Sequence, residues 1–203
     1  MSTDFRPGQV VSAQIYKLVG GGAPRPPSAQ AMLAQLRRGI GHPPGSVPDI
    51  WSVTLDGIPD DIRGVRREQA ELAVHVALTN FALHQQSKTA SMHVVGQSFG
   101  AAVRRLAALQ AGTGDAHETP IYRRFIALSS TTSMSALTTH LRGIITQLRG
   151  ADIGFDYARF ANDLLTLQTP QGLQRVQRSW GRDFHRNPSA LSTDQNETLG
   201  ALE

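Results

Sequence analysis

Apolar residues recur every three or four positions in one segment after another of this 203-residue chain, and this pattern constrains its fold most. Such a period places apolar side chains on one face of an α-helix, whereas a half-buried strand would alternate with a period of two. In the last such segment, Leu173, Val176, Trp180 and Phe184 fall within a narrow arc. The pattern predicts an all-α fold, a compact bundle of about seven to nine helices.

Residues that cap or interrupt helices divide this pattern into segments. We expect helices to start at Ser28, Ser98, Thr119, Ser133 or Ser135, Asp156 and Thr169. From about Arg66 to Gln86 apolar residues occur on nearly every face of the expected helix, which is typical of a helix at the centre of a core. Strand signals are limited to two short stretches, 50–55 and 92–95.

Glycine and proline mark the boundaries between larger units. We expect an N-terminal segment and linker at 1–27, a helical sub-bundle at 28–112, a second at 113–187 with a basic face, and a disordered tail at 188–203. Residues 5–18 of the first unit can form a short helix. A long Pro/Gly-rich loop at 42–61 lies within the second unit, and Trp51 can dock this loop onto the rest of the fold. A single bundle is the alternative to two sub-bundles.

Several classes of site are excluded or disfavoured. The chain has no cysteine, which excludes disulfides, thiolate metal sites and cysteine nucleophiles. His75, His84 and His93 lie nine residues apart, whereas metal ligands on one helix face need spacings of three or four, so we expect no metal and no cofactor. The most apolar stretch, 72–83, is shorter than the roughly 20 residues of a membrane span. We therefore expect a cytoplasmic protein that does not contact a membrane.

One segment matches a catalytic motif. Gly96-x-Ser98-x-Gly100 has the spacing of the nucleophile elbow of serine hydrolases, and Asp152 or Asp163 with His185 would nominally complete a triad. That fold needs several buried parallel strands, seen as runs of Val, Ile and Leu, and the chain lacks them. The simpler interpretation is that Ser98 caps a helix, with a serine hydrolase as the alternative.

The basic residues are nearly all arginine and are unevenly distributed. Of 20 basic residues 18 are arginine, and residues 98–187 carry eleven basic and six acidic side chains. Arginine grips phosphate with two parallel hydrogen bonds and stacks on bases. Codon bias can explain the ratio of arginine to lysine, so any argument for binding depends on where the arginines lie.

The last helical segment has the most informative arrangement. Arg175, Arg178, Arg182 and Arg186 fall opposite its apolar arc, and the only acid among them, Asp183, lies to the side. Such like charges repel one another at helical spacings, and a polyanion lying along them relieves this repulsion. The alternatives are a plain solvated face, or internal ion pairs of Arg182 with Asp183 and of Arg142 with Asp152.

Several segments resemble a known family, the small CasB-type subunit of the type I-E CRISPR surveillance complex, Cascade. The resemblance covers roughly residues 30–187. It rests on the order of Leu36-Arg37-Arg38-Gly39, Ala82-Leu83-His84-Gln85-Gln86, Met92-His93, Ser98-Phe99-Gly100-x-Ala102, Arg123-Arg124-Phe125, His140-Leu141-Arg142-Gly143, Asp156-Tyr157-Ala158 and Trp180-Gly181-Arg182-Asp183-Phe184. Each motif is weak alone, and the ordered set is more specific.

The resemblance implies a non-enzymatic, all-helical subunit. Its partners would be the backbone and large subunits of Cascade, a second copy of itself, the duplex of CRISPR RNA and target, and the displaced DNA strand. It implies that the matched motifs place Arg123, Arg124, Arg142 and Arg182 on nucleic acid. Helical geometry alone adds Arg149, Arg175 and Arg178, while Arg37 and Arg38 could equally contact partner subunits. A purely architectural subunit, whose arginines contact protein, is the alternative.

Overall fold

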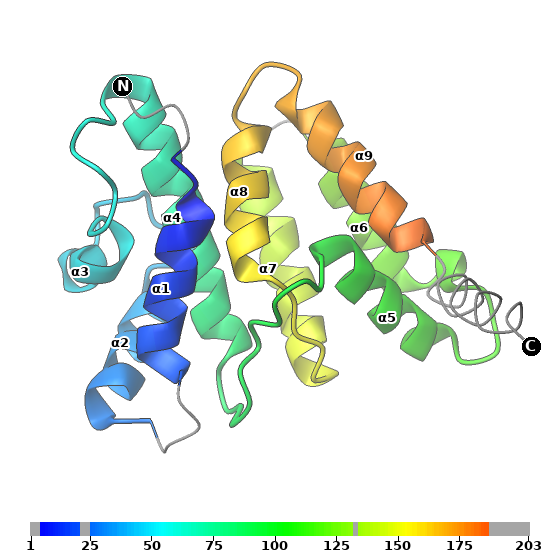
Figure 1. Ribbon diagram of the computed structural model, residues 1–203. Coiled ribbons are helices and arrows are strands. Elements are labelled where there is room, and N and C mark those ends of the chain that lie inside the picture. Colours follow the sequence, from blue (N-terminus) through cyan, green and yellow to red (C-terminus); the bar gives the residue numbers. More distant parts are fainter. Residues whose placement is uncertain (1–4, 21–24, 132–133, 187–203) are drawn as a thin grey trace, which may run out of the picture.

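The computed structural model describes residues 5–20, 25–131 and 134–186, and these fold into a bundle of helices (Figure 1). The α-helices are α1 (Pro7–Val19), α2 (Pro27–Arg38), α3 (Trp51–Thr54), α4 (Gly64–His84), α5 (Phe99–Ala111), α6 (Pro120–Ser130), α7 (Met134–Gly150), α8 (Tyr157–Leu167) and α9 (Gly172–His185). Two 3-10 turns, η1 (Pro48–Ile50) and η2 (Ala116–Glu118), complete the regular structure of these ranges. The all-α prediction is confirmed. The predicted tail at 188–203 and the predicted helix start at Ser133 lie outside the described residues.

Three helices begin at the capping residues that the sequence predicts. The side-chain oxygens of Ser98, Thr119 and Asp156 accept the backbone N–H groups of Ala101, Tyr122 and Arg159, respectively. These bonds satisfy N–H groups in the first turn that have no partner within the helix. They fix where α5, α6 and α8 begin, and hence where their side chains point.

Two predicted starts are wrong. Helix α2 begins at Pro27, because a proline suits the first position of a helix, and Ser28 lies inside it. Helix α9 begins at Gly172 after Gln171, whose φ of 61° is left-handed, and not at Thr169. The Thr169 hydroxyl instead donates to the carbonyl of Thr166 (2.7 Å) at the end of α8. A local interaction with the preceding helix thus takes the side chain that the sequence assigns to the next one.

Neither strand signal produces a strand. The loop at 42–61 contains η1 and α3, with Ile50 buried and the indole Nε1 of Trp51 donating to the carbonyl of Gly45 (2.8 Å). At 92–95 the chain makes a single parallel bridge, between His93 and Phe155. Both stretches are too short and too isolated to start a sheet in a bundle of helices.

Helix α4 lies at the centre, as its apolar sequence predicts, and packs against α1, α2, α7 and α8. Figure 1 shows α1 to α4 on one side, α5, α6 and α9 on the other, and α7 and α8 between them. Apolar side chains from both sides of residue 112 belong to one core cluster. The division into two sub-bundles at that residue stays a prediction. Helix α1, predicted as part of a separate segment, packs closely against α8.

Candidate nucleic-acid interface

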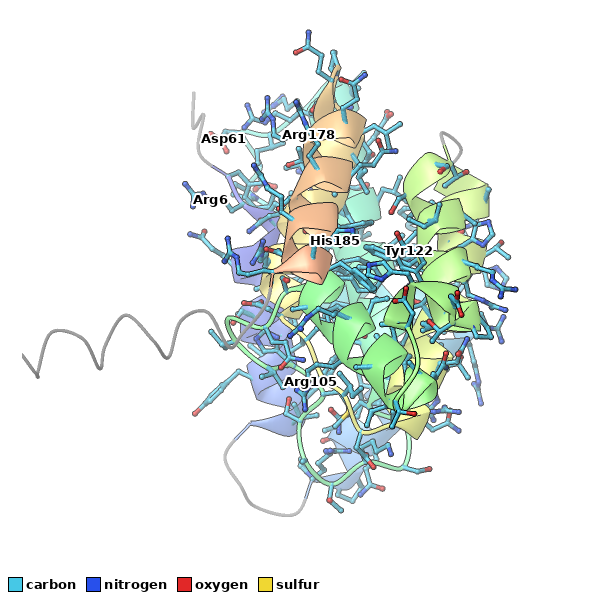
Figure 2. All side chains as sticks on the ribbon, turned by 90° about the vertical axis from the view of Figure 1, so that its right-hand side faces the viewer. Arg6, Asp61, Arg105, Tyr122, Arg178 and His185 are labelled. Carbon is cyan, nitrogen blue, oxygen red and sulfur yellow. The ribbon has the colours of Figure 1, made fainter. Side chains whose placement is uncertain are left out.

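Helix α9 separates apolar from basic side chains, as predicted. Val176, Trp180 and Phe184 are at most 2% exposed. On the opposite side, Arg175, Arg178, Arg182 and Arg186 are exposed, and we call these four residues the arginine stripe. The face that Figure 2 shows has α9 in front and the labelled Arg178 at its surface. Leu173, predicted to lie in the core, is only partly buried because it lies in the first turn of the helix.

Trp180 holds this helix against the core. Its ring lies 5.0 Å from that of Phe99 and stacks at 6.2 Å on Phe160, and its Nε1 donates to a carboxylate oxygen of Asp163 (2.7 Å). Gly100 allows α5 to approach α9 closely, since a Cβ there would overlap the backbone carbonyl of Trp180. These contacts fix the rotation of α9 about its axis, and therefore the direction in which the arginine stripe faces.

The acid within α9 does not neutralise the stripe. Asp183 accepts a hydrogen bond from an Nη of Arg159 on α8 (2.6 Å), and its side chain is mostly buried. The alternative pairing of Arg182 with Asp183 is therefore wrong, because Asp183 faces α8. The second alternative is wrong as well, since Asp152 pairs with Nζ of Lys88 (2.5 Å) and not with Arg142.

Asp163 has an unusual environment beneath the stripe. Burial raises the pKa of its carboxyl from 3.8 to about 6, although the hydrogen bond from Trp180 and the charge of Arg159 oppose the shift. A raised folded-state pKa means that the native protein binds this proton more tightly than the unfolded chain does. The contribution of this carboxyl to stability therefore falls as the pH rises from about 4 to about 6, and changes little above that range.

Changing Asp163→Asn is accordingly expected to raise the free energy of unfolding at neutral pH, by up to about 3 kcal/mol. The amide keeps an oxygen that accepts from Trp180 and has no charge to desolvate. The gain should shrink as the pH falls and be small near pH 4. Urea unfolding of both proteins across this range tests the expectation. A difference between them that does not change with pH would contradict it.

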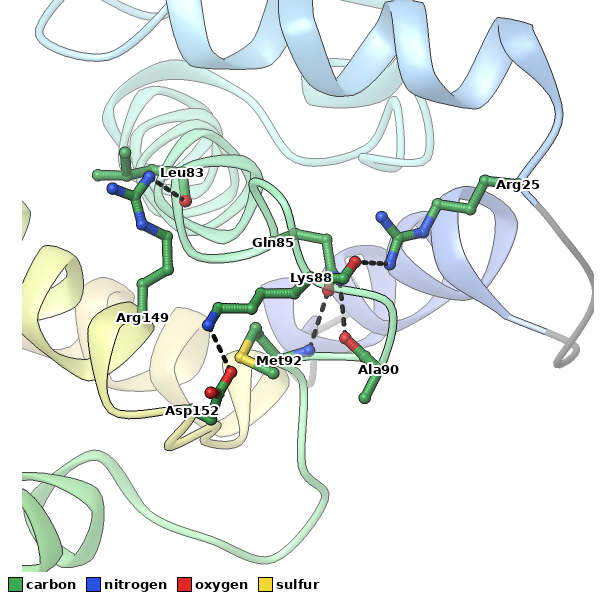
Figure 3. A network of polar contacts seen from close by, with 8 residues as sticks. All are labelled: Arg25, Leu83, Gln85, Lys88, Ala90, Met92, Arg149 and Asp152. Carbon is green, nitrogen blue, oxygen red and sulfur yellow. Dashed lines mark hydrogen bonds and ion pairs between the residues drawn. The ribbon is translucent and has the colours of Figure 1, made fainter.

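Arg149, placed on nucleic acid by helical geometry, is partly buried and reaches the turn that follows α4. Its Nη1 donates to Oε1 of Gln86 (2.7 Å). The same atom lies 3.5 Å from the carbonyl of Leu83, at the C-terminal end of α4 (Figure 3). The turn that follows α4 has two further contacts. Lys88 pairs with Asp152, and Nη2 of Arg25 donates to the Lys88 carbonyl (2.6 Å). Arg149 therefore has a visible structural role in this turn, while its contact with nucleic acid stays a prediction.

The arginines of α6 and α7 form a second exposed group. Arg123 donates to the carbonyl of Glu118 (3.0 Å), and the guanidinium of Arg124 lies against Gly143 of α7. Arg142 is exposed and lines a pocket of about 320 Å³ between α4, α7 and the loop after α2. These three residues come from helices other than α9, so they add to the arginine stripe only if a ligand spans both groups.

Arg37 and Arg38 lie apart from the other candidates. Both are on α2, at the far side of the bundle from α9 in Figure 1, with Arg37 partly buried and Arg38 exposed. A single nucleic-acid strand on α9 would not reach them directly. Contact with a partner subunit stays the prediction for this pair.

The proposed hydrolase triad is not assembled. The hydroxyl of Ser98 accepts the N–H of Ala101 as the cap of α5, and Asp163 accepts from Trp180. His185 is exposed and stacks on His117, with ring centroids 5.2 Å apart. Within the ranges that the structure describes, no hydrogen bond joins Ser98 to His185. Gly96 and Gly100 serve the loop and the close packing of α5, as the capping interpretation predicts.

Two arginines that line a pocket next to the arginine stripe were not predicted from the sequence as functional residues. Arg159 lies four residues before Asp163 on α8, a spacing that resembles an ordinary intrahelical ion pair. Arg104 follows the hydrolase-like motif and carries no motif of its own. The structure brings both next to the end of the arginine stripe, where they line a pocket with Arg186. No local signal could have joined these positions, which lie at least 27 residues apart in sequence.

The fold and sequence have clear relatives. The family model described as "CRISPR-associated protein Cse2" matches residues 32–185. CasB from Thermobifida fusca is 34% identical over 89% of this chain and 98% of its own, with a TM-score of 0.71. A Cse2-family protein from Thermus thermophilus, 23% identical over 89% and 99% of the two chains, shares the fold with a TM-score of 0.66.

Two further findings bound the assignment. No curated protein matches the chain. None of the helices described is both long and apolar enough to cross a membrane. The family match spans most of the chain and includes every motif on which the resemblance rests. The chain belongs to the CRISPR-associated Cse2 family and is a CasB-type small subunit of the CRISPR Cascade complex.

Proposed function

We propose that this subunit performs no chemistry and holds nucleic-acid backbone within Cascade, stabilising the R-loop and its displaced strand. The observation that carries the proposal is the arginine stripe. Three of its side chains are exposed on one face of α9 and the fourth, Arg186, directly follows the helix, while the carboxylate of α9, Asp183, is bound by Arg159 of α8. The stripe is therefore a line of positive charge without a compensating acid on its own helix.

Physical reasons favour a polyanion as the ligand of the stripe. Like charges three or four residues apart on a helix are mutually destabilising, and phosphates lying along them reverse the sign of that interaction. Contacts to phosphate position a strand without reading its sequence. This suits a complex in which the guide RNA reads the target by base pairing. The strands would be the CRISPR RNA–target duplex and the displaced DNA.

The proposal includes protein partners in an antiviral complex in the cytoplasm. These would be the backbone and large subunits of Cascade and a second copy of this chain. Exposed apolar side chains on the helices next to α9 suit such contacts, since Leu109 of α5 is 67% exposed and Ile126 of α6 is 45% exposed. They also favour the second candidate function, a purely architectural subunit whose arginines contact protein.

The proposal is tested by the dependence of binding on salt. If each arginine of the stripe neutralises one phosphate of single-stranded DNA, the slope of log K against log salt concentration should be about −3. Two oligonucleotides of equal length and unrelated sequence should give the same affinity, measured by fluorescence anisotropy. Absence of binding at low salt, or binding that does not respond to salt, would refute the proposal.

A further inference from the structure

A small pocket lies where the N-terminal end of α5 meets α8 and the C-terminal end of α9. It has a volume of about 200 Å³, and three arginines line it, Arg104, Arg159 and Arg186, together with Asp183. A water molecule occupies about 30 Å³ in the liquid, so the pocket has room for one phosphate group and some of its hydration. We call it the arginine pocket.

The charges of the arginine pocket favour an anion. Three arginines face one carboxylate, and that carboxylate is already hydrogen-bonded to Arg159 (2.6 Å). Two further acids lie close to Arg159, namely Asp156 and Asp163, but neither lines the pocket. Asp156 uses its two carboxylate oxygens on the backbone N–H groups of Gly96 and Arg159, each at 3.0 Å. The lining of the pocket therefore carries three positive charges against one negative charge.

Arg104 supplies an independent sign of a missing partner. Its Nε is buried, yet it makes no hydrogen bond among the residues described. Buried N–H groups in native proteins nearly always have an acceptor, and each exception calls for an explanation such as a ligand or ion. An anion in the pocket would give this guanidinium the acceptors that the protein does not provide.

Arg159 is positioned by contacts with α9 and keeps hydrogen-bond donors for such a ligand. One of its Nη atoms contacts both Asp183 (2.6 Å) and the hydroxyl of Ser179 (3.4 Å), so the side chain is fixed from the α9 side. A guanidinium has five N–H donors in a planar fork, and those not used by Asp183 stay available to a phosphate. Helix α5 is thirteen residues long, and its N-terminal end adds a positive partial charge at the pocket.

The position of the pocket relative to α9 indicates where the phosphate comes from. Arg186 belongs both to the pocket and to the arginine stripe, and Arg182 precedes it by four residues, about 6 Å along the helix axis. A strand that follows the stripe thus reaches the pocket at its end. We propose that the arginine pocket binds one phosphate of this strand and so anchors it; this rests on the proposed function.

The first test uses an arginine-modifying dicarbonyl reagent on the full-length chain, with modified sites identified by mass spectrometry. Excess inorganic phosphate is expected to protect Arg104 and Arg186 but not Arg175 or Arg178. A single-stranded oligonucleotide should protect all four. If phosphate protects Arg104 no more than Arg175, the pocket is not a phosphate site. If phosphate protects the pocket and the oligonucleotide does not, the pocket takes free phosphate and the anchoring proposal is wrong.

The same experiment separates this inference from the proposed function. Protection of Arg175 and Arg178 by the oligonucleotide reports the stripe, whatever happens in the pocket. If the oligonucleotide protects these two but not Arg104, the stripe binds a strand and the pocket does not. If it protects neither group, the proposed function itself is wrong.

The second test measures affinity in matched variants. Arg104→Gln is expected to weaken binding of single-stranded DNA about tenfold, and to make the salt slope shallower by about 0.7. Its neighbour Arg105 is exposed and donates to Oε1 of Gln97 outside the lining of the pocket, so Arg105→Gln should leave the slope nearly unchanged. Equal losses in the two variants, or an unchanged slope in Arg104→Gln, would overturn the proposal.

A third variant guards against a folding defect. Arg186 is exposed and follows the last residue of α9, so Arg186→Gln removes a pocket charge without disturbing the core. It should lose affinity and salt slope by amounts similar to those of Arg104→Gln, while its urea unfolding midpoint matches that of the wild type. If Arg186→Gln binds like the wild type, the pocket does not anchor the strand.

Discussion

Changing Arg175, Arg178 and Arg182 together to glutamate is expected to weaken binding of single-stranded DNA by the isolated chain about a hundredfold. Each exposed ion pair contributes at most about 1 kcal/mol, so three together contribute about 3 kcal/mol, and 1.4 kcal/mol corresponds to a factor of ten. Reversing the charges adds repulsion to this loss. Anisotropy titrations at a fixed low salt concentration measure the change.

The matched control moves the same three charge reversals away from α9. Lys17 of α1, Arg38 of α2 and Arg63, which precedes α4, are all exposed. Their joint change to glutamate alters the net charge by the same amount as the α9 triple variant. It should lower the logarithm of the binding constant by less than a third as much. Similar losses in both triple variants would mean that net charge governs binding and not the stripe.

The same α9 variant also separates the two candidate functions. A nucleic-acid support predicts that the variant still assembles into Cascade but stabilises the R-loop poorly. The architectural alternative predicts lost assembly with unchanged affinity for DNA, because protein partners would then occupy the arginines. Reconstitution with the other subunits, followed by size-exclusion chromatography, reports assembly independently of binding.

Changing Trp180→Ala is expected to destabilise the fold by about 3–5 kcal/mol. The indole is 1% exposed, packs on Phe99 and Phe160, and donates to Asp163. Its removal leaves a cavity and takes a hydrogen-bond donor from a buried carboxyl group. Since a domain of this kind is stable by only about 5–15 kcal/mol, the urea unfolding midpoint should fall by about a fifth or more.

The control for this variant is the second tryptophan. Trp51 is 47% exposed and donates to the carbonyl of Gly45, so Trp51→Ala should lose much less stability, about 1 kcal/mol. Trp180→Phe, which keeps most of the buried area and loses only the hydrogen bond, should fall between the two. If Trp180→Ala unfolds at the midpoint of the wild type, Trp180 does not anchor α9 as the structure indicates.

The sequence predicted the elements whose causes are local. The 3.6-residue period of apolar side chains identified the helices, because the face of a helix on which a residue lies depends only on its position along the chain. Ser98, Thr119 and Asp156 were correct as caps since each contacts an N–H only three residues away. For the same reason the exposed face of α9 could be placed before its neighbours were known.

The errors arose where a neighbouring segment competed for a side chain. Thr169 bonds back to α8 instead of capping α9, and the stretch at 50–55 coils into a helix because it lies in an all-helical environment. The contact of Arg149 with Gln86, which is more than 60 residues away in sequence, likewise could not be predicted from a single segment. Such competition is decided by packing, which single-segment patterns do not contain.

What the sequence determined by itself was the helical class, the opposite apolar and basic faces of α9, and the family to which the chain belongs. Only the tertiary structure decided which charges meet. It gave Asp183 to Arg159, which left the arginine stripe uncompensated, and it gathered Arg104, Arg159 and Arg186 around one pocket. The physical reason is that the faces of a helix follow from its own period, whereas ion pairs and pockets form between helices and depend on how they pack.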